Sequence, residues 1–236
     1  MNIDKLTADQ VSVLQLSDSF FPTGMYTNSN GLEAIFYSDK SKINDANKLR
    51  DLIKVYINHQ IGPADCTALG NSYDCAQRSD LQKLLEVDQI LFSMKLMREI
   101  REASTRSGSQ LLRCLISFIP DNYLLNKFQD AIKHGQATGV YPVVMALACS
   151  TLDISKNTAG MIMLYSFTVS MVGAALRLGM LQHFEGQRII HELRPEIIET
   201  VRKNIGRPLT SMWQFAPGID IVQTRHERMN SKMFIT

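Results

Sequence analysis

Apolar residues recur along most of this chain at intervals of three and four positions, the spacing that places them on one side of an α-helix. In the segment 46–60 they form a single stripe, and Asn44, just before it, is the predicted N-cap. The segment 79–104 continues the pattern without a break. It therefore predicts one long amphipathic helix that begins near Ser79 or Asp80.

Three shorter helical patterns, at 122–135, 141–153 and 195–206, are bounded by proline or glycine, the residues that often begin and end helices. Alternation of apolar and polar residues, which would predict β-strands, is nearly absent. Its best example is the short stretch IDIV at 219–222. The pattern therefore predicts an all-α protein, a single compact multi-helix domain over residues 1–236 with about eight to ten helices around a central apolar helix.

The central helix is predicted at 158–176, where nineteen consecutive residues carry no charge. A helix of this length nearly crosses the hydrocarbon core of a bilayer, so a membrane span is one interpretation. Against it, Ser166, Thr168 and Ser170 lie in the middle of the run, a basic flank is missing on one side, and no second span follows. A helix that is apolar all round is also what the centre of a large helical domain requires, and we favour this interpretation.

Composition narrows the class of protein without identifying it. Of the 236 residues, 45% are hydrophobic and 20% are charged, which is ordinary for a globular protein. Basic residues exceed acidic ones by only two, so the chain lacks the basic excess that binds nucleic acid. Four widely spaced cysteines form no CxxC pair and are expected to be free thiols. The first residues lack the order of a signal peptide, and we expect a cytoplasmic protein.

Candidate catalytic chemistry is sparse. The stretch HERMN begins like the zinc-binding helix HExxH, but Asn230 replaces the second histidine. His183 and His191 are eight residues apart and could share one side of a helix, although a metal site would need further ligands. The sequence contains neither a phosphate-binding glycine motif nor a Gly-x-Ser-x-Gly elbow. We therefore predict no catalytic residues and a protein that is not an enzyme.

Three stretches are unusual for a plain helical domain. The first, 14–33, joins two helices through a Phe-Phe-Pro-Thr-Gly loop whose proline and glycine predict a turn. The second, 98–112, contains Gly108, which is expected to interrupt its helix and to allow another backbone to approach closely. The third, 213–236, is rich in aromatic residues and methionine, and we expect it to dock on the core or on a partner.

These three stretches and the segment 173–188 resemble the urease accessory protein UreF family in four motifs that occur in the right order. LQLSDSFFPTGMYTNSNGLE resembles its L-Q-L-x-D motif, P-x-G turn and closing G-L-E, and REIREASTRSGSQLL resembles its central R-E-x-x-E segment. GAALRLGMLQHFEGQR resembles its A-A-x-[KR]-L helix and the G-Q pair that follows. PGIDIVQTRHERMNSKMF resembles its C-terminal R-H-E ending.

The resemblance implies an all-α, non-enzymatic scaffold for the maturation of nickel urease. Its partners would be the accessory protein UreD or UreH, the GTPase UreG and the urease apoprotein, in an assembly that contains the scaffold as a homodimer. No tightly bound cofactor is implied, and nickel would be present only transiently within the complex. The segments 1–33 and 207–236 are expected to lie at partner interfaces.

Individual residues are carried over only where this sequence matches the family motifs. A role in partner binding is expected from Tyr26, Glu33, Arg177, Gln187, Arg225, His226, Glu227 and Phe234. Glu33 is also expected to orient the N-terminal loop. A structural role in turns and close contacts is expected from Pro22, Gly24, Gly31, Gly108 and Gly186.

One departure from the family pattern concerns metal binding. Asn28 stands where the family usually has histidine, and an amide neither titrates nor binds nickel well. His183 and His226 are then the remaining nickel candidates. The alternative hypothesis is a helical metal-binding protein or metalloenzyme that uses His183, His191 and His226.

Overall fold

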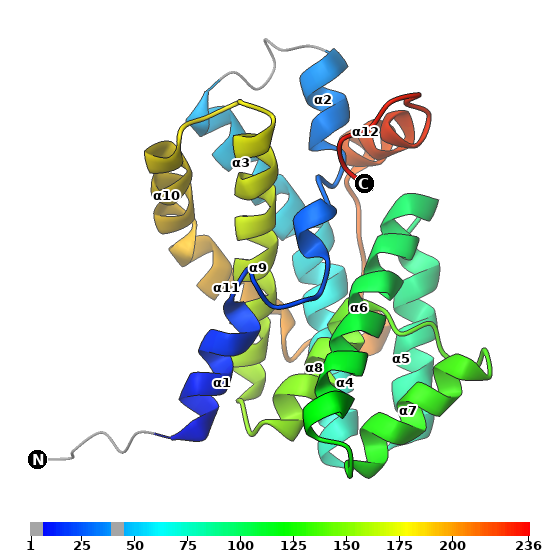
Figure 1. Cartoon of the computed structure of the whole chain (residues 1–236). Coiled ribbons are helices and arrows are strands. Elements are labelled where there is room, and N and C mark those ends of the chain that lie inside the picture. Colours follow the sequence, from blue (N-terminus) through cyan, green and yellow to red (C-terminus); the bar gives the residue numbers. More distant parts are fainter. Residues whose placement is uncertain (1–6, 39–44) are drawn as a thin grey trace, which may run out of the picture.

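The computed structural model describes residues 7–38 and 45–236 and contains no strand within them. The predicted all-α class is therefore confirmed (Figure 1). The elements in chain order are α1 (Ala8–Ser17), η1 (Met25–Thr27), α2 (Leu32–Ser38), α3 (Ala46–Tyr56), η2 (Ile57–Cys66), α4 (Thr67–Gln77), α5 (Leu81–Met94), α6 (Arg98–Phe118), α7 (Tyr123–Lys133), α8 (Tyr141–Thr151), α9 (Lys156–Arg177), α10 (His183–Glu192), α11 (Arg194–Asn204), η3 (Leu209–Ser211) and α12 (Pro217–Glu227).

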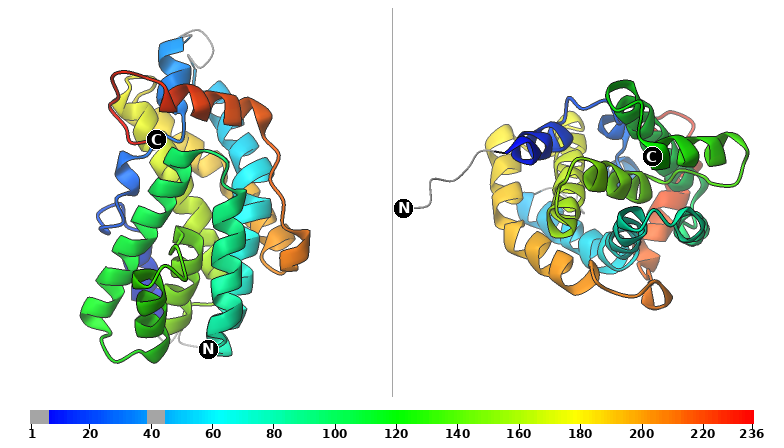
Figure 2. Two further views of the ribbon diagram at one scale, coloured as in Figure 1. Left: turned by 90° about the vertical axis from the view of Figure 1, so that its right-hand side faces the viewer. Right: turned by 90° about the horizontal axis from the view of Figure 1, so that it is seen from below.

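Helix α9 is the central apolar helix. It packs against α1, α4, α8, α10 and α11, and the view from below in Figure 2 shows helices arranged around it. Among the described helices it alone is long and apolar enough to cross a membrane, but 67% of its most apolar window is buried inside the protein. This burial confirms the core-helix interpretation, since a membrane-facing helix would leave its apolar surface uncovered by protein.

Helix ends follow the chemistry of capping residues, with one correction. Helix α3 is capped by Asp45, whose carboxylate accepts a hydrogen bond from the Lys48 N–H at 2.9 Å. The predicted cap, Asn44, lies outside the described residues. Helix α5 is capped in the same way by Asp80, as predicted. The stretch IDIV lies inside α12, which begins at Pro217, so it forms no strand.

The single long helix predicted over 79–104 is wrong, because the chain breaks between α5 and α6. At the break, Lys95 turns inward to a buried ion pair with Asp65. The Arg101 guanidinium donates hydrogen bonds to the carbonyl oxygens of Lys95 and Leu96 at 2.8 and 2.9 Å. Both helices bury one apolar face, so hydrophobic spacing runs across the break without revealing it.

Gly108 does not interrupt α6, but the predicted close approach is confirmed. A Cβ atom at this position would lie 2.0 Å from the Gly139 carbonyl oxygen, in the segment that leads into α8. No side chain fits in that space. Glycine therefore allows α6 and the start of α8 to pack backbone against backbone.

Helix α3 continues directly into η2, a π-helix that contains Pro63. Its wider turns leave backbone carbonyl groups free for other partners. The Pro63 carbonyl oxygen accepts from the Trp213 N–H at 3.3 Å, and the His59 carbonyl oxygen accepts from the Phe215 N–H at 2.9 Å. These bonds hold the segment between η3 and α12 against the core.

The cysteines are free, as predicted, and three of the four are buried. Burial raises the pKa of the Cys66 and Cys149 thiols to about 12, so both stay protonated near neutral pH. They behave as small apolar core residues.

Candidate functional site

The described part of the N-terminal segment binds the C-terminal segment, although more than two hundred residues separate them. The Ser29 N–H donates to the Thr236 carbonyl oxygen at 2.9 Å, and the Ser29 hydroxyl donates to the same oxygen. The Asn30 N–H donates to the Thr236 hydroxyl at 3.1 Å. We call the contact of residues 27–33 with residues 226–236 the terminal junction.

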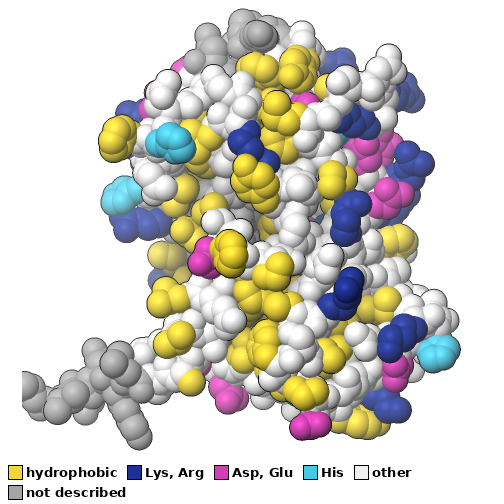
Figure 3. Space-filling model, viewed as in Figure 1, with side chains coloured by type: hydrophobic (Ala, Val, Ile, Leu, Met, Phe, Trp, Pro, Cys, Tyr) yellow, Lys and Arg dark blue, Asp and Glu magenta, His cyan; other side chains and the backbone are white. Residues whose placement is uncertain are grey.

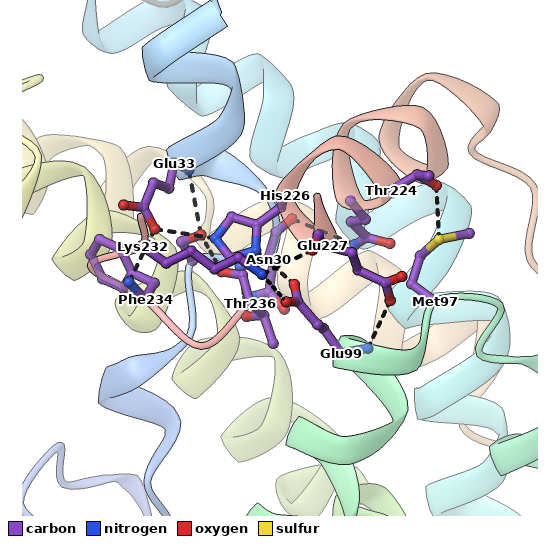
Figure 4. Close-up of polar contacts among 12 residues, drawn as sticks. Asn30, Glu33, Met97, Glu99, Thr224, His226, Glu227, Lys232, Phe234 and Thr236 are labelled. Atoms are coloured by element: carbon purple, nitrogen blue, oxygen red, sulfur yellow. Dashed lines mark hydrogen bonds and ion pairs between the residues drawn. The ribbon is translucent and has the colours of Figure 1, made fainter. Parts of the chain in front are cut away.

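Glu33, in the first turn of α2, is the central acceptor of the terminal junction (Figure 4). Its Oε1 accepts from the Met233 N–H at 2.7 Å, and its Oε2 accepts from the Phe234 N–H at 3.0 Å. The same Oε2 lies 3.1 Å from Nε2 of His226, and both side chains are only 1% exposed. One buried carboxylate therefore fixes the chain on both sides of the turn that follows α12.

His226 is held between two carboxylates. Its Nδ1 lies 2.7 Å from Oε2 of Glu99 on α6, opposite the contact with Glu33. The Lys232 ammonium group donates to Oε1 of Glu99, and the Glu227 carboxylate accepts from the Glu99 N–H at 2.9 Å. These contacts connect α2, α6 and α12 through side chains that are largely shielded from water (Figure 4).

The terminal junction is expected to weaken in acid because of Glu99. Burial alone would raise the pKa of this carboxyl. Hydrogen bonds and charge from Lys232 and His226 lower it by more than burial raises it, so its pKa lies below the ordinary 4.5. A carboxyl with a lowered pKa stabilises the fold above its unfolded-state pKa, and this stabilisation is lost as the pH falls through the folded-state pKa. Amide-exchange protection at 233–236 should therefore fall progressively below pH 4.5.

A Glu99→Gln variant is the control for this pH dependence. It keeps the size of the side chain but cannot titrate, so protection at 233–236 should be lower at neutral pH and should change less in acid. An unchanged acid profile in the variant would assign the effect to another group.

Arg177, the last residue of α9, lies between two aromatic rings of the terminal segments. Its guanidinium carbon is 3.7 Å from the centre of the Tyr26 ring and 4.4 Å from that of the Phe234 ring. Stacking of this kind is attractive because the ring faces are electron-rich. The Arg177 Nε donates to the Gly173 carbonyl oxygen at 3.1 Å. Arg177 therefore joins the end of the core helix to both terminal segments.

The predicted turn residues occupy special backbone positions. Pro22 lies at the centre of a tight turn closed by a 2.7 Å hydrogen bond between the residues on either side of it, and Gly24 precedes η1 with a φ of 75°. Gly31 has a φ of 92°, and a Cβ there would lie 3.0 Å from Cγ1 of Val222 on α12. At Gly186 a Cβ would lie 2.8 Å from a side chain of α9. Each position favours glycine or proline on physical grounds.

The structure brings together most of the residues predicted to bind partners. The six that lie in or against the terminal junction are Tyr26, Glu33, Arg177, His226, Glu227 and Phe234. Gln187 on α10 and Arg225 on α12 are exposed to solvent. Glu33, His226 and Phe234 are buried, so their direct role is to hold the chain segments together.

The alternative hypothesis of a site built from three histidines is wrong. His226 is buried in the terminal junction, whereas His183 and His191 are exposed on α10, which lies well away from α12 (Figure 1). The Nε2 of His191 is 2.9 Å from the Arg194 guanidinium group. Across residues 7–38 and 45–236, no three His, Cys, Asp or Glu side chains are grouped so that they could hold a metal ion.

Sequence reasoning missed Glu99 and Lys232. Glu99 is the second residue of the REIREAS motif, and an acidic residue in the first turn of α6 is expected from the helix dipole alone. Nothing in the local sequence pattern indicates that its carboxylate contacts His226, which lies on α12, far along the chain.

Apolar side chains are exposed on α1 and on the loop that leads from it to the terminal junction. Phe20, in the loop after α1, is 91% exposed, and Val11, Leu14 and Tyr26 are also exposed. Figure 3 shows hydrophobic side chains gathered down the middle of the face that carries this loop. Phe184, at the start of α10, is 90% exposed. Exposed apolar groups of this size commonly mark surfaces that bind other proteins.

In comparisons with known proteins, the matching family model and the similar proteins carry the same name, UreF. The UreF family model matches residues 43–194. The urease accessory protein UreF of Trichodesmium erythraeum (strain IMS101) is 30% identical over 227 residues, which cover 96% of this chain and 97% of that protein. The UreF protein of Bacillus sp. (strain TB-90) is 30% identical over 96% of this chain and 98% of its own length. The UreF protein of Actinobacillus pleuropneumoniae serotype 5b (strain L20) is 27% identical over 95% of this chain and 98% of its own length.

Proposed function

Because the chain belongs to the UreF family of urease accessory proteins, we propose that it acts in urease maturation as a non-enzymatic scaffold in the cytoplasm. In this proposal it binds a UreD/UreH-type protein and recruits the GTPase UreG to the urease apoprotein. The scaffold is a homodimer within the complex. It holds no cofactor tightly, and nickel passes through the assembly only transiently.

The observation that carries the proposal is the exposed apolar surface on α1 and the loop that follows it. We assign partner binding to α1 and the loop before η1, which we call the Phe20 surface: Val11, Leu14, Phe20 and Tyr26. Burying aromatic and aliphatic side chains on association supplies most of the binding free energy of typical interfaces. Scaffold function needs such a surface and needs no catalytic group.

Arg177 supports this surface from behind. Its Nη2 atom is buried, so a partner protein does not reach that atom directly. It stacks on Tyr26, whose ring is 64% exposed on the other side. We therefore interpret Arg177 as a positioning residue that fixes the exposed Tyr26 ring for partner contact and is itself held by the buried Phe234 ring.

Size-exclusion chromatography with light scattering tests the proposal, with the chain mixed first with its own UreD/UreH-type partner and then with UreG. We expect a stable two-fold complex that retains the GTPase. A Phe20→Asp variant should bind the UreD/UreH-type partner at least about tenfold more weakly, because a buried aromatic anchor commonly contributes more than about 1 kcal/mol. Its helical content should be unchanged, since Phe20 contributes little to the core.

The matched control is Tyr123→Asp on α7, which changes a side chain that is 70% exposed outside the Phe20 surface. This variant should assemble like the unmodified chain. Absence of any complex from folded components would contradict the scaffold proposal. Equal losses in both variants would contradict only the assignment of the surface.

A further inference from the structure

Helix α6 presents a row of arginines to solvent. Exposed residues recur along it every three or four positions and therefore share one face of the helix: Arg98, Glu102, Arg106, Gln110 and Arg113. The opposite face is buried and packs on α8. Three of the five exposed residues are arginines, and Glu102 is the one acidic residue of the row. We call this row the α6 basic face.

The α6 basic face is separate from the Phe20 surface and continues toward α12. In Figure 1, α1 lies to the left of α9 and α6 to its right. Helix α12 contacts the first turn of α6 through the Glu227 carboxylate and exposes Arg225 and Arg228. Figure 3 shows Lys and Arg side chains following one another down the right-hand part of the molecule, where Figure 1 places α12 and α6. Positive charge is therefore gathered on one side of a chain whose formal net charge is only +2.

Two arginines of the α6 basic face have no acidic partner within the described part of the chain. On α10 and α11, Arg188 and Arg202 lie 3.8 and 3.9 Å from glutamates of their own helices. Arg98 is 3.8 Å from Glu102, but no ion pair of Arg106 or Arg113 is found within residues 7–38 and 45–236. Both guanidinium groups are therefore available to a carboxylate of another molecule.

These charges contribute little to the stability of α6. Arg98 is its first residue, where the helix dipole disfavours a cation. Arg106 and Arg113 are seven residues apart, beyond the three or four residues over which side chains of one helix contact each other. Since the helix gains little from its arginines, a role in binding is favoured.

The spacing and sign of the charges determine which kind of partner fits. Arg98, Arg106 and Arg113 are eight and seven residues apart, which is about 12 and about 10.5 Å along the helix. Carboxylates two turns apart on a helix of another protein have the same spacing. Duplex DNA carries a charge about every 1.7 Å, far more densely than this row, and its phosphates would be repelled by Glu102. A helix with a neutral or basic residue opposite Glu102 avoids that repulsion.

We propose that the α6 basic face binds an acidic helix of a partner protein, whose carboxylates pair with Arg98, Arg106 and Arg113. Arginine can hold a carboxylate through two parallel N–H···O bonds, which makes the contact geometrically specific. Each exposed ion pair contributes little alone, so binding requires the three pairs together. In the proposed scaffold this face holds a second protein beside the one on the Phe20 surface, but binding of an acidic helix does not depend on that function.

Fluorescence anisotropy on the whole chain tests the proposal, with a synthetic alanine-based helical peptide as the probe. The matched peptide carries three glutamates, eight and seven residues apart, and a shuffled peptide of the same composition places them on different faces. At about 0.1 M salt the matched peptide should bind at least about fivefold more tightly than the shuffled one. Binding should be lost at about 1 M salt, where charges are screened within about 3 Å. Equal binding of the two peptides, or no binding of either, would overturn the proposal.

Substitutions on α6 test the assigned residues. An Arg106→Glu, Arg113→Glu double variant should bind the matched peptide at least about tenfold more weakly, because two attractive pairs become repulsive. The matched control, Arg188→Glu, Arg202→Glu, makes the same change of net charge on α10 and α11 and should bind like the unmodified chain. All four side chains are exposed, so helical content should not change. Equal losses in the two double variants would contradict the assignment to α6.

Exchange of charge separates pairing at these positions from general attraction. A peptide with lysines in place of the three glutamates should bind an Arg98→Glu, Arg106→Glu, Arg113→Glu triple variant but not the unmodified chain. Failure of the folded triple variant to bind this peptide would refute the pairing. A DNA duplex that binds the unmodified chain more tightly than the matched peptide would overturn the choice of a protein partner. Retained binding of the matched peptide without assembly of the urease accessory complex would support this proposal and contradict the scaffold function.

Discussion

Replacing Glu33 by alanine is expected to release the C-terminal segment and to lower the free energy of unfolding by about 3 kcal/mol. The carboxylate accepts from two backbone N–H groups, of Met233 and Phe234, and contacts His226. Each buried polar group left without a partner costs about 1–3 kcal/mol. Detachment of the segment lets these groups reach water, which limits the total loss.

Denaturant unfolding gives the change in stability, and hydrogen exchange shows where it acts. Amides of 233–236 should lose nearly all protection in Glu33→Ala, while core helix α9 stays protected. Glu227→Ala is the control, since this half-buried carboxylate accepts a single backbone hydrogen bond from α6 and its loss should cost about 1 kcal/mol. If both variants lose equal stability, Glu33 is not the central acceptor of the terminal junction.

Gly108→Ala is expected to destabilise the protein by about 2 kcal/mol or more. The added Cβ would lie 2.0 Å from the Gly139 carbonyl oxygen and 3.0 Å from the Tyr141 backbone nitrogen. Both neighbours are backbone atoms, so α6 and α8 must move apart. Alanine favours a helix over glycine by about 1 kcal/mol, which offsets only part of this cost.

Gly173→Ala is the matched control, because Gly173 also lies inside a long helix but a Cβ added there would meet nothing within 4 Å. This substitution should stabilise the protein by about 0.5–1 kcal/mol. Thermal unfolding of the two variants should therefore show shifts in opposite directions. A stabilising Gly108→Ala would mean that the two helices do not pack as closely as described.

Local signals in the sequence predicted most of the fold. Helical spacing, together with proline and glycine at helix ends, identified the shorter helices, and the uncharged run identified α9. The break at Lys95 was missed because both flanking helices keep an apolar face, and the cause of the break is a partner on η2. The π-helix has no pattern of its own, since Pro63 alone predicts only a bend.

The candidate site was predictable as a set of residues but not as an arrangement. Family motifs selected Glu33, His226 and Phe234, yet sequence spacing carries no information about a contact across about two hundred residues. For that reason the sequence predicts that these side chains contact a partner. In the structure they are buried and hold the chain segments together. Glu99 was overlooked because its partner His226 lies on another helix.

The terminal junction also has a consequence for synthesis of the protein. The residues that fix the far end of the loop carrying Phe20, from His226 to Thr236, emerge from the ribosome some two hundred residues after that loop. Until then the Arg177 guanidinium group can stack on the Tyr26 ring but not on the Phe234 ring. Under the proposed function, a nascent or truncated chain would present an incomplete docking face, and partner binding would select chains whose translation has reached these residues.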